Sequence, residues 1–168
     1  MSDSRVALIT GGTRGIGRAI AERLLADGHR LSLGLRDPAA LKASASAFSD
    51  PSTARDVVCD VSDPAQVEAA VTTLAHQFGR VDALVNNAGV AVFKPIGQTT
   101  FEEWRHVLGT NLDGAFLCTQ AAAPIMLRGG RGGAVVNIAS ISGLRASTLR
   151  VAYGTSKGAL IHLTKQQA

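Results

Sequence analysis

The chain has 168 residues, of which 46% are hydrophobic and 18% are charged. This composition excludes an intrinsically disordered chain, and the length suits one domain with a buried core. The net charge of +4 comes from 17 lysines and arginines that are dispersed along the sequence, so it does not indicate a nucleic-acid partner. No apolar run approaches the ~18 residues of a membrane span, so we expect no membrane partner either.

Two kinds of apolar segment alternate along the chain. Short runs rich in β-branched residues predict buried parallel strands, and longer runs with apolar residues at helical spacing predict helices. In chain order we expect strand Arg5–Thr10, helix Ile16–Gly28, strand Arg30–Leu35, helix Pro38–Phe48, strand Asp56–Cys59, helix Asp63–Gly79, strand Val81–Gly89, helix Thr100–Gly130, strand Gly133–Ser140 and helix Ala152–Ala168.

Helix-capping residues support this order. Asp63 followed by Pro64 is typical of a helix N-terminus, and Thr100 with Glu103 has the spacing of a capping box. The alternation predicts one α/β domain over residues 1–168, a doubly wound parallel sheet with five strands and with helices on both faces. In such a sheet, ligands bind at the carboxyl ends of the strands.

Two cysteines, Cys59 and Cys118, lie far apart, without a CxxC pair or a nearby set of histidines. They are typical of reduced, buried thiols in a cytoplasmic protein. We therefore expect neither a disulfide framework nor a metal site.

A glycine-rich turn, TGGTRGIG (10–17), connects the first strand to the first helix. Its glycines permit a tight turn and let backbone N–H groups approach a phosphate at the positive end of the helix dipole. The pyrophosphate of a dinucleotide suits this arrangement, and the absence of Lys-Ser/Thr after the last glycine disfavours a P-loop hydrolase. A plain tight turn is the alternative explanation.

The end of the second strand usually distinguishes NAD from NADP, because an acid there binds the ribose 2′-hydroxyl and an arginine accommodates a 2′-phosphate. Arg36 stands at this place, and Arg14 in the glycine turn is a second cation. We therefore favour NADP(H) over NAD(H). The choice stays open, because a shift of two residues would make Asp37 the NAD-type acid and because both arginines could be solvated surface cations.

Four residues form a candidate catalytic group. Tyr153 and Lys157 are four residues apart in the last helix, so they share one face, and an ammonium beside a phenol favours the phenolate. Ser140 ends the fifth strand at the ligand edge, where its hydroxyl could hold a carbonyl oxygen. Asn111 lies inside the long helix, although asparagine is a mediocre helix former. Singly, each also has an ordinary structural explanation, such as a solvated helix face or a local backbone hydrogen bond.

The sequence resembles the short-chain dehydrogenase/reductase family in six motifs that follow the family's order and spacing. They are TGGTRGIG (10–17), CDVSD (59–63), NNAG (86–89), NLDG (111–114), NIASISG (137–143) and YGTSK (153–157). The resemblance implies a Rossmann-type NAD(P)-binding domain that transfers a hydride between a nicotinamide and a small carbonyl or alcohol substrate. It also implies a homo-oligomer.

By this resemblance, Tyr153 is the general acid and base, and Lys157 assists it and holds the nicotinamide ribose. Ser140 orients the substrate oxygen, and Asn111 holds a water in the proton relay. The other cofactor contacts would lie in the glycine turn and at the strand ends. Beside Tyr153 and Lys157, the expected cofactor-binding residues are Gly11, Thr13, Arg14, Gly15, Ile16, Gly17, Arg36, Asp60, Val61, Asn87, Ala88 and Gly89.

The motifs end inside the last helix, whereas chains of the family continue with two more strand–helix units. We therefore expect an incomplete C-terminus that lacks the family's last strands and substrate lid, and a fifth strand whose open edge invites another chain. Two alternatives to an oxidoreductase remain. One is a non-catalytic fragment that binds a dinucleotide or a partner protein, and the other, from charge alone, is a nucleic-acid binder.

Overall fold

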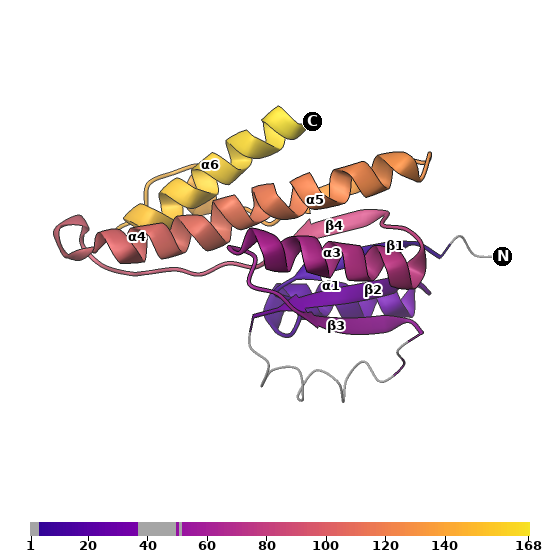
Figure 1. Ribbon diagram of the computed structural model, residues 1–168. Helices are drawn as coiled ribbons and strands as arrows, with labels where there is room; N and C mark the ends of the chain where they lie inside the picture. The colour runs from indigo at the N-terminus through magenta and orange to yellow at the C-terminus, as the bar shows by residue number, and fades with distance from the viewer. Residues whose placement is uncertain (1–3, 37–49, 51) are drawn as a thin grey trace.

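A parallel sheet forms the centre of the molecule (Figure 1). The computed structural model describes residues 4–36, 50 and 52–168. In this part of the chain the strand order is β3-β2-β1-β4-β5, and each neighbouring pair is parallel. The strands are β1 (Val6–Thr10), β2 (Arg30–Leu35), β3 (Ala54–Val58), β4 (Ala83–Asn86) and β5 (Ala134–Asn137). This confirms the predicted fold class, a Rossmann-type sheet whose strand order reverses beside β1.

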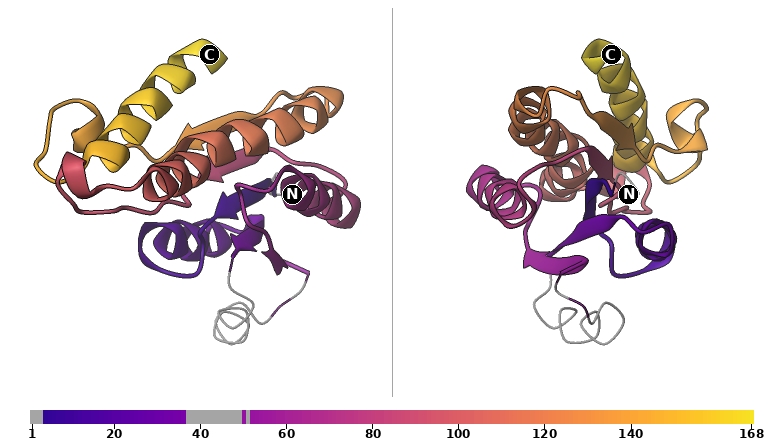
Figure 2. Two further views of the ribbon diagram at one scale, coloured as in Figure 1. Left: turned by 60° about the vertical axis from the view of Figure 1, so that its left-hand side comes forward. Right: turned by 90° about the vertical axis from the view of Figure 1, so that its right-hand side faces the viewer.

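Helices cover both faces of the sheet (Figure 2). Ile9 of β1 packs in the core layer that includes α1 (Gly15–Ala26). Its neighbour Leu8 points to the other face, where α3 (Pro64–Phe78) and α5 (Gly114–Arg128) pack. Both residues are almost completely buried, so β1 is the central strand of two hydrophobic layers. No helix in the described ranges is long and apolar enough to cross a membrane.

The long helix predicted over Thr100–Gly130 is present but is not α-helical throughout. α4 (Phe101–Leu108) leads into a π-helical turn, η2 (Gly109–Asp113), and α5 follows without a break. A π turn contains one extra residue, which redirects the side chains around it. Asn111 lies in this turn and is buried, with its side chain bonded to the loop after β4.

The other elements lie close to their predicted ranges. α6 (Val151–Gln167) differs from its prediction by one residue at each end, and β3 begins two residues earlier than expected because its register with β2 starts at Ala54. Two short 3₁₀ helices, η1 (Ile96–Gln98) and η3 (Ile141–Gly143), occupy loops at the carboxyl edge of the sheet. The helix expected at Pro38–Phe48 lies outside the described residues.

The helix starts confirm the predicted caps. The Asp63 carboxylate accepts hydrogen bonds from the backbone N–H groups of Ala65 and Gln66, at 2.9 and 3.3 Å. Thr100 and Glu103 form a reciprocal capping box at the start of α4. These local bonds fix where α3 and α4 begin.

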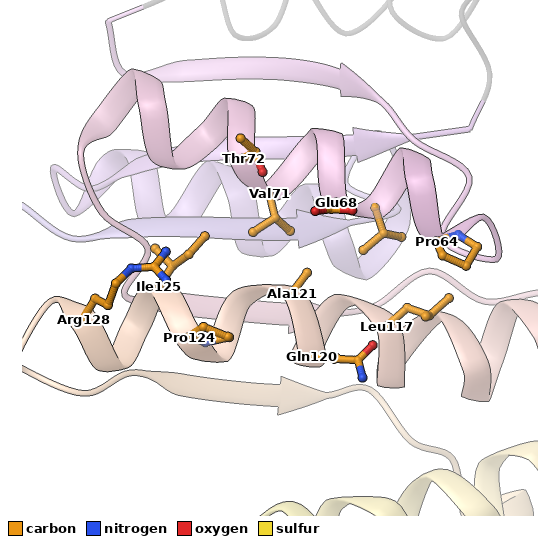
Figure 3. A pocket seen from close by; sticks show the side chains of 11 residues that line it. Pro64, Glu68, Val71, Thr72, Leu117, Gln120, Ala121, Pro124, Ile125 and Arg128 are labelled. Carbon is orange, nitrogen blue, oxygen red and sulfur yellow. The ribbon is translucent and has the colours of Figure 1, made fainter.

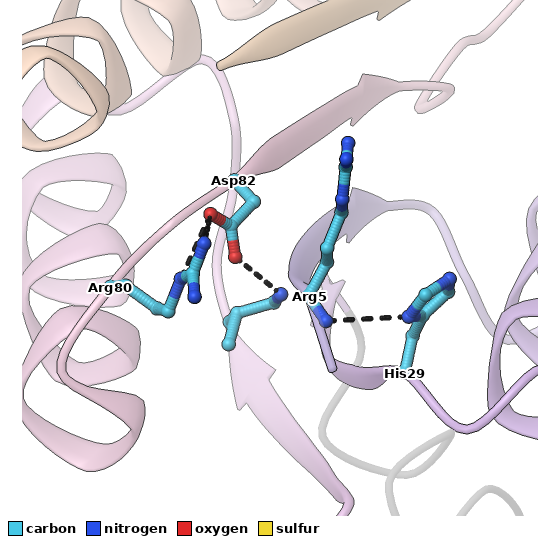
Figure 4. Close-up of polar contacts among 5 residues, drawn as sticks. Arg5, His29, Arg80 and Asp82 are labelled. Carbon is cyan, nitrogen blue, oxygen red and sulfur yellow. Dashed lines mark hydrogen bonds and ion pairs between the residues drawn. The ribbon is translucent and has the colours of Figure 1, made fainter. Parts of the chain in front are cut away.

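The amino end of the sheet is fastened by Asp82 (Figure 4). One carboxylate oxygen accepts the N–H of Val6 at 2.8 Å, and the other accepts the Nε–H of Arg80 at 2.8 Å. Nearby, the N–H of Arg5 donates to Nδ1 of His29 at 3.3 Å. These contacts tie β1 to its neighbours at the edge opposite the predicted site.

Candidate active site

The glycine turn between β1 and α1 is shaped by close backbone approaches. Gly11 and Gly15 have positive φ angles of 65° and 54°, which residues with side chains rarely adopt. A Cβ on Gly17 would lie 2.4 Å from the carbonyl oxygen of Gly11 and 2.5 Å from Nδ2 of Asn87. The turn thus has no side chain at Gly11, Gly15 and Gly17, close to the start of α1, where unpaired N–H groups and the helix dipole favour a phosphate. This cradle fits the pyrophosphate of a dinucleotide.

Asn87 fastens the glycine turn to the end of β4. Its Nδ2 donates to the carbonyl oxygens of Thr10 and Gly11, both at 2.9 Å. The Thr10 hydroxyl oxygen accepts the N–H groups of Asn87 and Ala88, each at 3.0 Å. Thr10 is absent from the residues predicted above, and its only sequence signal is a hydroxyl at the end of an apolar strand. These bonds make the glycine turn and the loop after β4 into one wall of the site.

Three further predicted residues surround this cradle. Thr13 is half-buried in the turn, and Arg14 is the exposed N-cap residue of α1. The side chain of Ile16 is 59% exposed on the first turn of the helix. An apolar side chain held in water beside a phosphate cradle can pack against a bound ligand.

Arg36 and Asp60 are close enough, at the ends of β2 and β3, for their charges to interact. Burial alone would raise the pKa of Asp60, but hydrogen bonds from Ser62 (2.9 and 2.6 Å) and the charge of Arg36 hold that pKa below its ordinary value. Arg36 itself is exposed. Val61 buries its side chain in the core, so its contact with an adenine would use the backbone. Asp37 lies outside the described residues.

Lys157 is buried on α6, and its Nζ donates to the carbonyl oxygen of Ile138 at 2.6 Å. Burial lowers the pKa of this ammonium group. Nζ lies 6.0 Å from the centre of the Tyr153 ring. A Cβ on Gly89 would lie 3.7 Å from Nζ and 3.4 Å from Oδ1 of Asn111. The loop after β4, the π-helical turn and α6 therefore converge around Gly89.

Both N–H groups and the oxygen of the Asn111 side-chain amide have partners within the protein. Nδ2 donates to the Val90 carbonyl at 2.9 Å and to the Ser156 hydroxyl at 3.0 Å, and Oδ1 accepts the N–H of Val90 at 2.8 Å. Ser156 in turn donates to the carbonyl oxygen of Tyr153 at 2.8 Å. Asn111 thus joins the loop after β4 to the helix that carries Tyr153. Ser156 is absent from the predicted residues, although it lies within the YGTSK motif.

Ser140 follows β5 and caps η3, with its hydroxyl oxygen accepting the N–H of Ser142 at 3.2 Å. A hydroxyl also has a proton of its own, and none of the residues described here accepts it. η3 packs tightly on α6, since a Cβ on Gly143 would lie 2.6 Å from the carbonyl carbon of Lys157. Glycine at this position therefore lets the segment after Ser140 approach α6.

The variant Lys157→Met tests how burial acts on this site. We expect it to be at least as stable as the wild type at pH 7, because it removes a buried charge. Between the lowered pKa of folded Lys157 and its ordinary value of 10.5, only the unfolded chain holds the proton. The free energy of unfolding of the wild type therefore rises with pH in this window. The stability advantage of Lys157→Met over the wild type becomes smaller as a result. Urea denaturation at pH 7 and pH 10 measures this. A variant less stable by more than about 1 kcal/mol at pH 7 would show that the bond to Ile138 outweighs desolvation.

A separate groove of about 410 Å³ lies between α3 and α5 (Figure 3). Val71 and Glu68 of α3 line it, together with Ala121 and Arg128 of α5. None of the predicted site residues lines this groove. In residues 4–36 and 52–168, no three His, Cys, Asp or Glu side chains are placed to hold a metal ion.

The fold defines a class of protein, the domains built on a Rossmann-type parallel sheet. The family model described as short chain dehydrogenase matches residues 5–168. The chain therefore belongs to the short-chain dehydrogenase family.

Similar proteins extend beyond the length of this chain. It is 40% identical over 164 residues to D-threitol dehydrogenase of Mycolicibacterium smegmatis, covering 97% of this chain and 63% of that protein. It is 37% identical to the NADP-dependent (R)-specific alcohol dehydrogenase of Lentilactobacillus kefiri, covering 98% and 65%. A crystal structure of a short chain dehydrogenase/reductase from Burkholderia phymatum in complex with NAD matches with a TM-score of 0.93 and 34% identity, covering 98% and 59%. The chain thus spans less than two thirds of the length of each.

Proposed function

We propose that the chain forms the cofactor-binding and catalytic part of an oxidoreductase that transfers a hydride between NADP(H) and a small alcohol or carbonyl compound. The convergence of Asn111 and Lys157 on Gly89, next to the glycine cradle and with the Tyr153 ring centre 6.0 Å from Nζ of Lys157, carries this proposal. Membership in the short-chain dehydrogenase family supports the class of reaction.

The cradle would hold the cofactor through Gly11, Gly17 and Asn87, with the pyrophosphate at the start of α1. When bound, a nicotinamide dinucleotide supplies the hydride chemistry. Lys157, whose Nζ lies 3.7 Å from the place of a Cβ on Gly89, would hold the nicotinamide ribose with its ammonium.

Ser140 would bind the substrate oxygen, and Tyr153 would exchange a proton with it. In the reducing direction, the Ser140 hydroxyl donates a hydrogen bond to the carbonyl oxygen, and Tyr153 gives that oxygen its phenolic proton as the hydride reaches the carbon. In the oxidising direction, the Tyr153 phenolate takes the proton back from the alcohol. The ammonium of Lys157, whose Nζ lies 6.0 Å from the centre of the Tyr153 ring, is the positive charge beside this proton transfer.

We propose that the Asn111 side chain positions the loop after β4 against α6. Both amide protons are donated to protein partners, so the side chain has none left for a water. A water in the proton relay would therefore donate to an oxygen of Asn111, either Oδ1 or the main-chain carbonyl in the π-helical turn.

The transfer of deuterium tests the reaction. The chain is incubated with reduced cofactor carrying deuterium at nicotinamide C4 and with a panel of small ketones and polyol-derived ketoses, and the alcohols are examined by mass spectrometry. We expect deuterium on the carbinol carbon of at least one product. Tight cofactor binding with no transfer to any ketone would instead favour the non-catalytic fragment.

NADPH is expected to bind about tenfold more tightly than NADH, because a 2′-phosphate can bind Arg36 and Arg14 through charge-assisted hydrogen bonds. Nicotinamide fluorescence gives both affinities. Arg36→Gln should remove most of the preference, and Arg105→Gln, exposed on α4, should leave it unchanged. Equal affinities in the wild type would contradict the assignment and favour Asp37 as an NAD-type acid.

The proposal includes self-association. The side chains of Phe116 and Leu127 are eleven residues apart on α5, so they share one face, and they are 45% and 74% exposed. Val136 on β5 is 49% exposed. A second copy would remove this apolar surface from water. We expect light scattering to give at least the mass of a dimer, and a stable monomer would contradict this part of the proposal.

We also propose a cytoplasmic site of action. Cys59 and Cys118 are free and buried, and burial raises their pKa values to about 11 and 12. Such thiols stay protonated and unreactive, which suits a reducing compartment.

A further inference from the structure

Arg150 stands at the start of the catalytic helix, three residues before Tyr153. It is the N-cap residue of α6, and its carbonyl oxygen accepts the N–H of Gly154 at 2.7 Å. The loop after β4 reaches the same place. There the backbone of Lys94 forms an isolated parallel β-bridge with that of Arg150, and the N–H of Lys94 donates to the carbonyl oxygen of Leu149 at 3.0 Å. Arg150 therefore lies between two of the segments that build the site.

The Arg150 guanidinium contacts η3, the short helix that follows Ser140. It stacks over the ring of Phe93 at 5.0 Å, and its Nη1 donates to the hydroxyl oxygen of Ser142 at 3.4 Å. Ser142 also donates its N–H to the Ser140 hydroxyl oxygen. One residue thus connects Arg150 to the serine that would hold the substrate oxygen.

Within the described part of the chain, no carboxylate neutralises the charge of Arg150. Its neighbour Lys94 forms an ion pair with Glu103 at 2.5 Å. For Arg150, the described parts of the chain supply an aromatic ring and a hydroxyl but no carboxylate within ion-pair distance. Stacking on a ring leaves the edge of a guanidinium free, with several N–H donors in one plane.

The backbone before Arg150 is strained. Leu149 has a φ of 60°, a left-handed conformation that leucine rarely adopts. Such strain persists only where the surrounding structure enforces it, and it is concentrated at functional sites. The turn at Leu149 directs the chain into α6 and sets the place of Arg150.

We propose that Arg150 is a specificity-determining residue that binds an oxyanion group of the substrate, so that the substrate is an anionic carbonyl or alcohol compound. This inference rests on the proposed function, because it locates the reacting oxygen at Ser140 and Tyr153. A planar guanidinium binds a carboxylate, sulfonate or phosphate with two parallel hydrogen bonds. Ile141 and Leu149, 58% and 50% exposed, can cover the short apolar part that separates the oxyanion from the carbonyl.

Acetoacetate and its methyl ester form a matched pair of probes, because they share the ketone and differ in the charge. We expect the wild type to reduce acetoacetate with a kcat/KM at least about tenfold higher than that of the ester, the range for a charged hydrogen bond. Arg150→Met keeps the length of the side chain without the charge, and it should bring the ratio of the two kcat/KM values close to one. Arg105→Gln should leave the ratio as in the wild type. The same ratio in the wild type and Arg150→Met would overturn the inference.

Binding without turnover separates this inference from the proposed function. We expect acetoacetate, but not its methyl ester, to shift the ¹⁵N-resolved Nε–Hε signal of Arg150 and not that of Arg105. Such a shift in a chain that transfers deuterium to no ketone of the panel supports an anion site and contradicts the oxidoreductase proposal. Reduction of both compounds at equal rates, or equal shifts at Arg150 and Arg105, overturns the anion site.

Discussion

Tyr153→Phe is expected to lower kcat for carbonyl reduction by about 10²–10⁴-fold, the contribution of a positioned general acid. The variant keeps the aromatic ring, 6.0 Å from Nζ of Lys157, and removes only the hydroxyl. Tyr153 is the only tyrosine of the chain, so no second phenol can replace it. The rate of loss of reduced-nicotinamide absorbance under saturating substrate measures the effect.

Cofactor binding is the control for this variant. The cradle at Gly11, Gly17 and Asn87 does not include the phenol, so the NADPH affinity of Tyr153→Phe should stay within about threefold of the wild type, less than 1 kcal/mol. A variant that binds NADPH normally and reduces ketones at the wild-type rate would remove Tyr153 from the role of acid. A variant that no longer binds NADPH would instead show that the tyrosine holds the cofactor.

The sheet could be predicted because its signals are local. β1 is buried over its whole length, Val6–Thr10, and a short apolar run of this kind stands out in the sequence. Parallel pairing then follows from the alternation of strands and helices. The π-helical turn at Gly109–Asp113 could not be predicted in this way, because it arises where the buried side chain of Asn111 meets Val90 and Ser156.

The sequence predicts candidate site residues where a residue type and its spacing carry the chemistry, as for Tyr153 and Lys157. The residues that hold the site together were missed, because their partners are distant in the sequence. Thr10 bonds to the backbone of Asn87, 77 residues away, and Ser156 bonds to a side chain 45 residues away. A sequence shows the hydroxyl at each position but not the partner that the fold brings to it.

Gly17→Ala is expected to weaken NADPH binding at least about a hundredfold. If the turn cannot adjust to the added Cβ, the free energy of unfolding should instead fall by about 2–4 kcal/mol. The added Cβ would lie 2.4 Å from the Gly11 carbonyl oxygen and 2.5 Å from Nδ2 of Asn87. These two atoms form a 2.9 Å hydrogen bond with each other, so moving either atom opens the wall between β1 and β4. Nicotinamide fluorescence and urea denaturation measure the two effects.

Two other glycines separate the clash from a general effect of alanine. At Gly15 a Cβ meets nothing within 4 Å, but φ is 54°, so Gly15→Ala should cost only about 1 kcal/mol. At Gly97 there is neither a clash nor a positive φ, so Gly97→Ala should stay within about 0.5 kcal/mol of the wild type. If Gly17→Ala binds NADPH as tightly as Gly97→Ala does, the close approach of Gly11 and Asn87 is not needed to hold the cofactor. If only Gly17→Ala loses the cofactor, the cradle depends on the absence of a side chain at this one position.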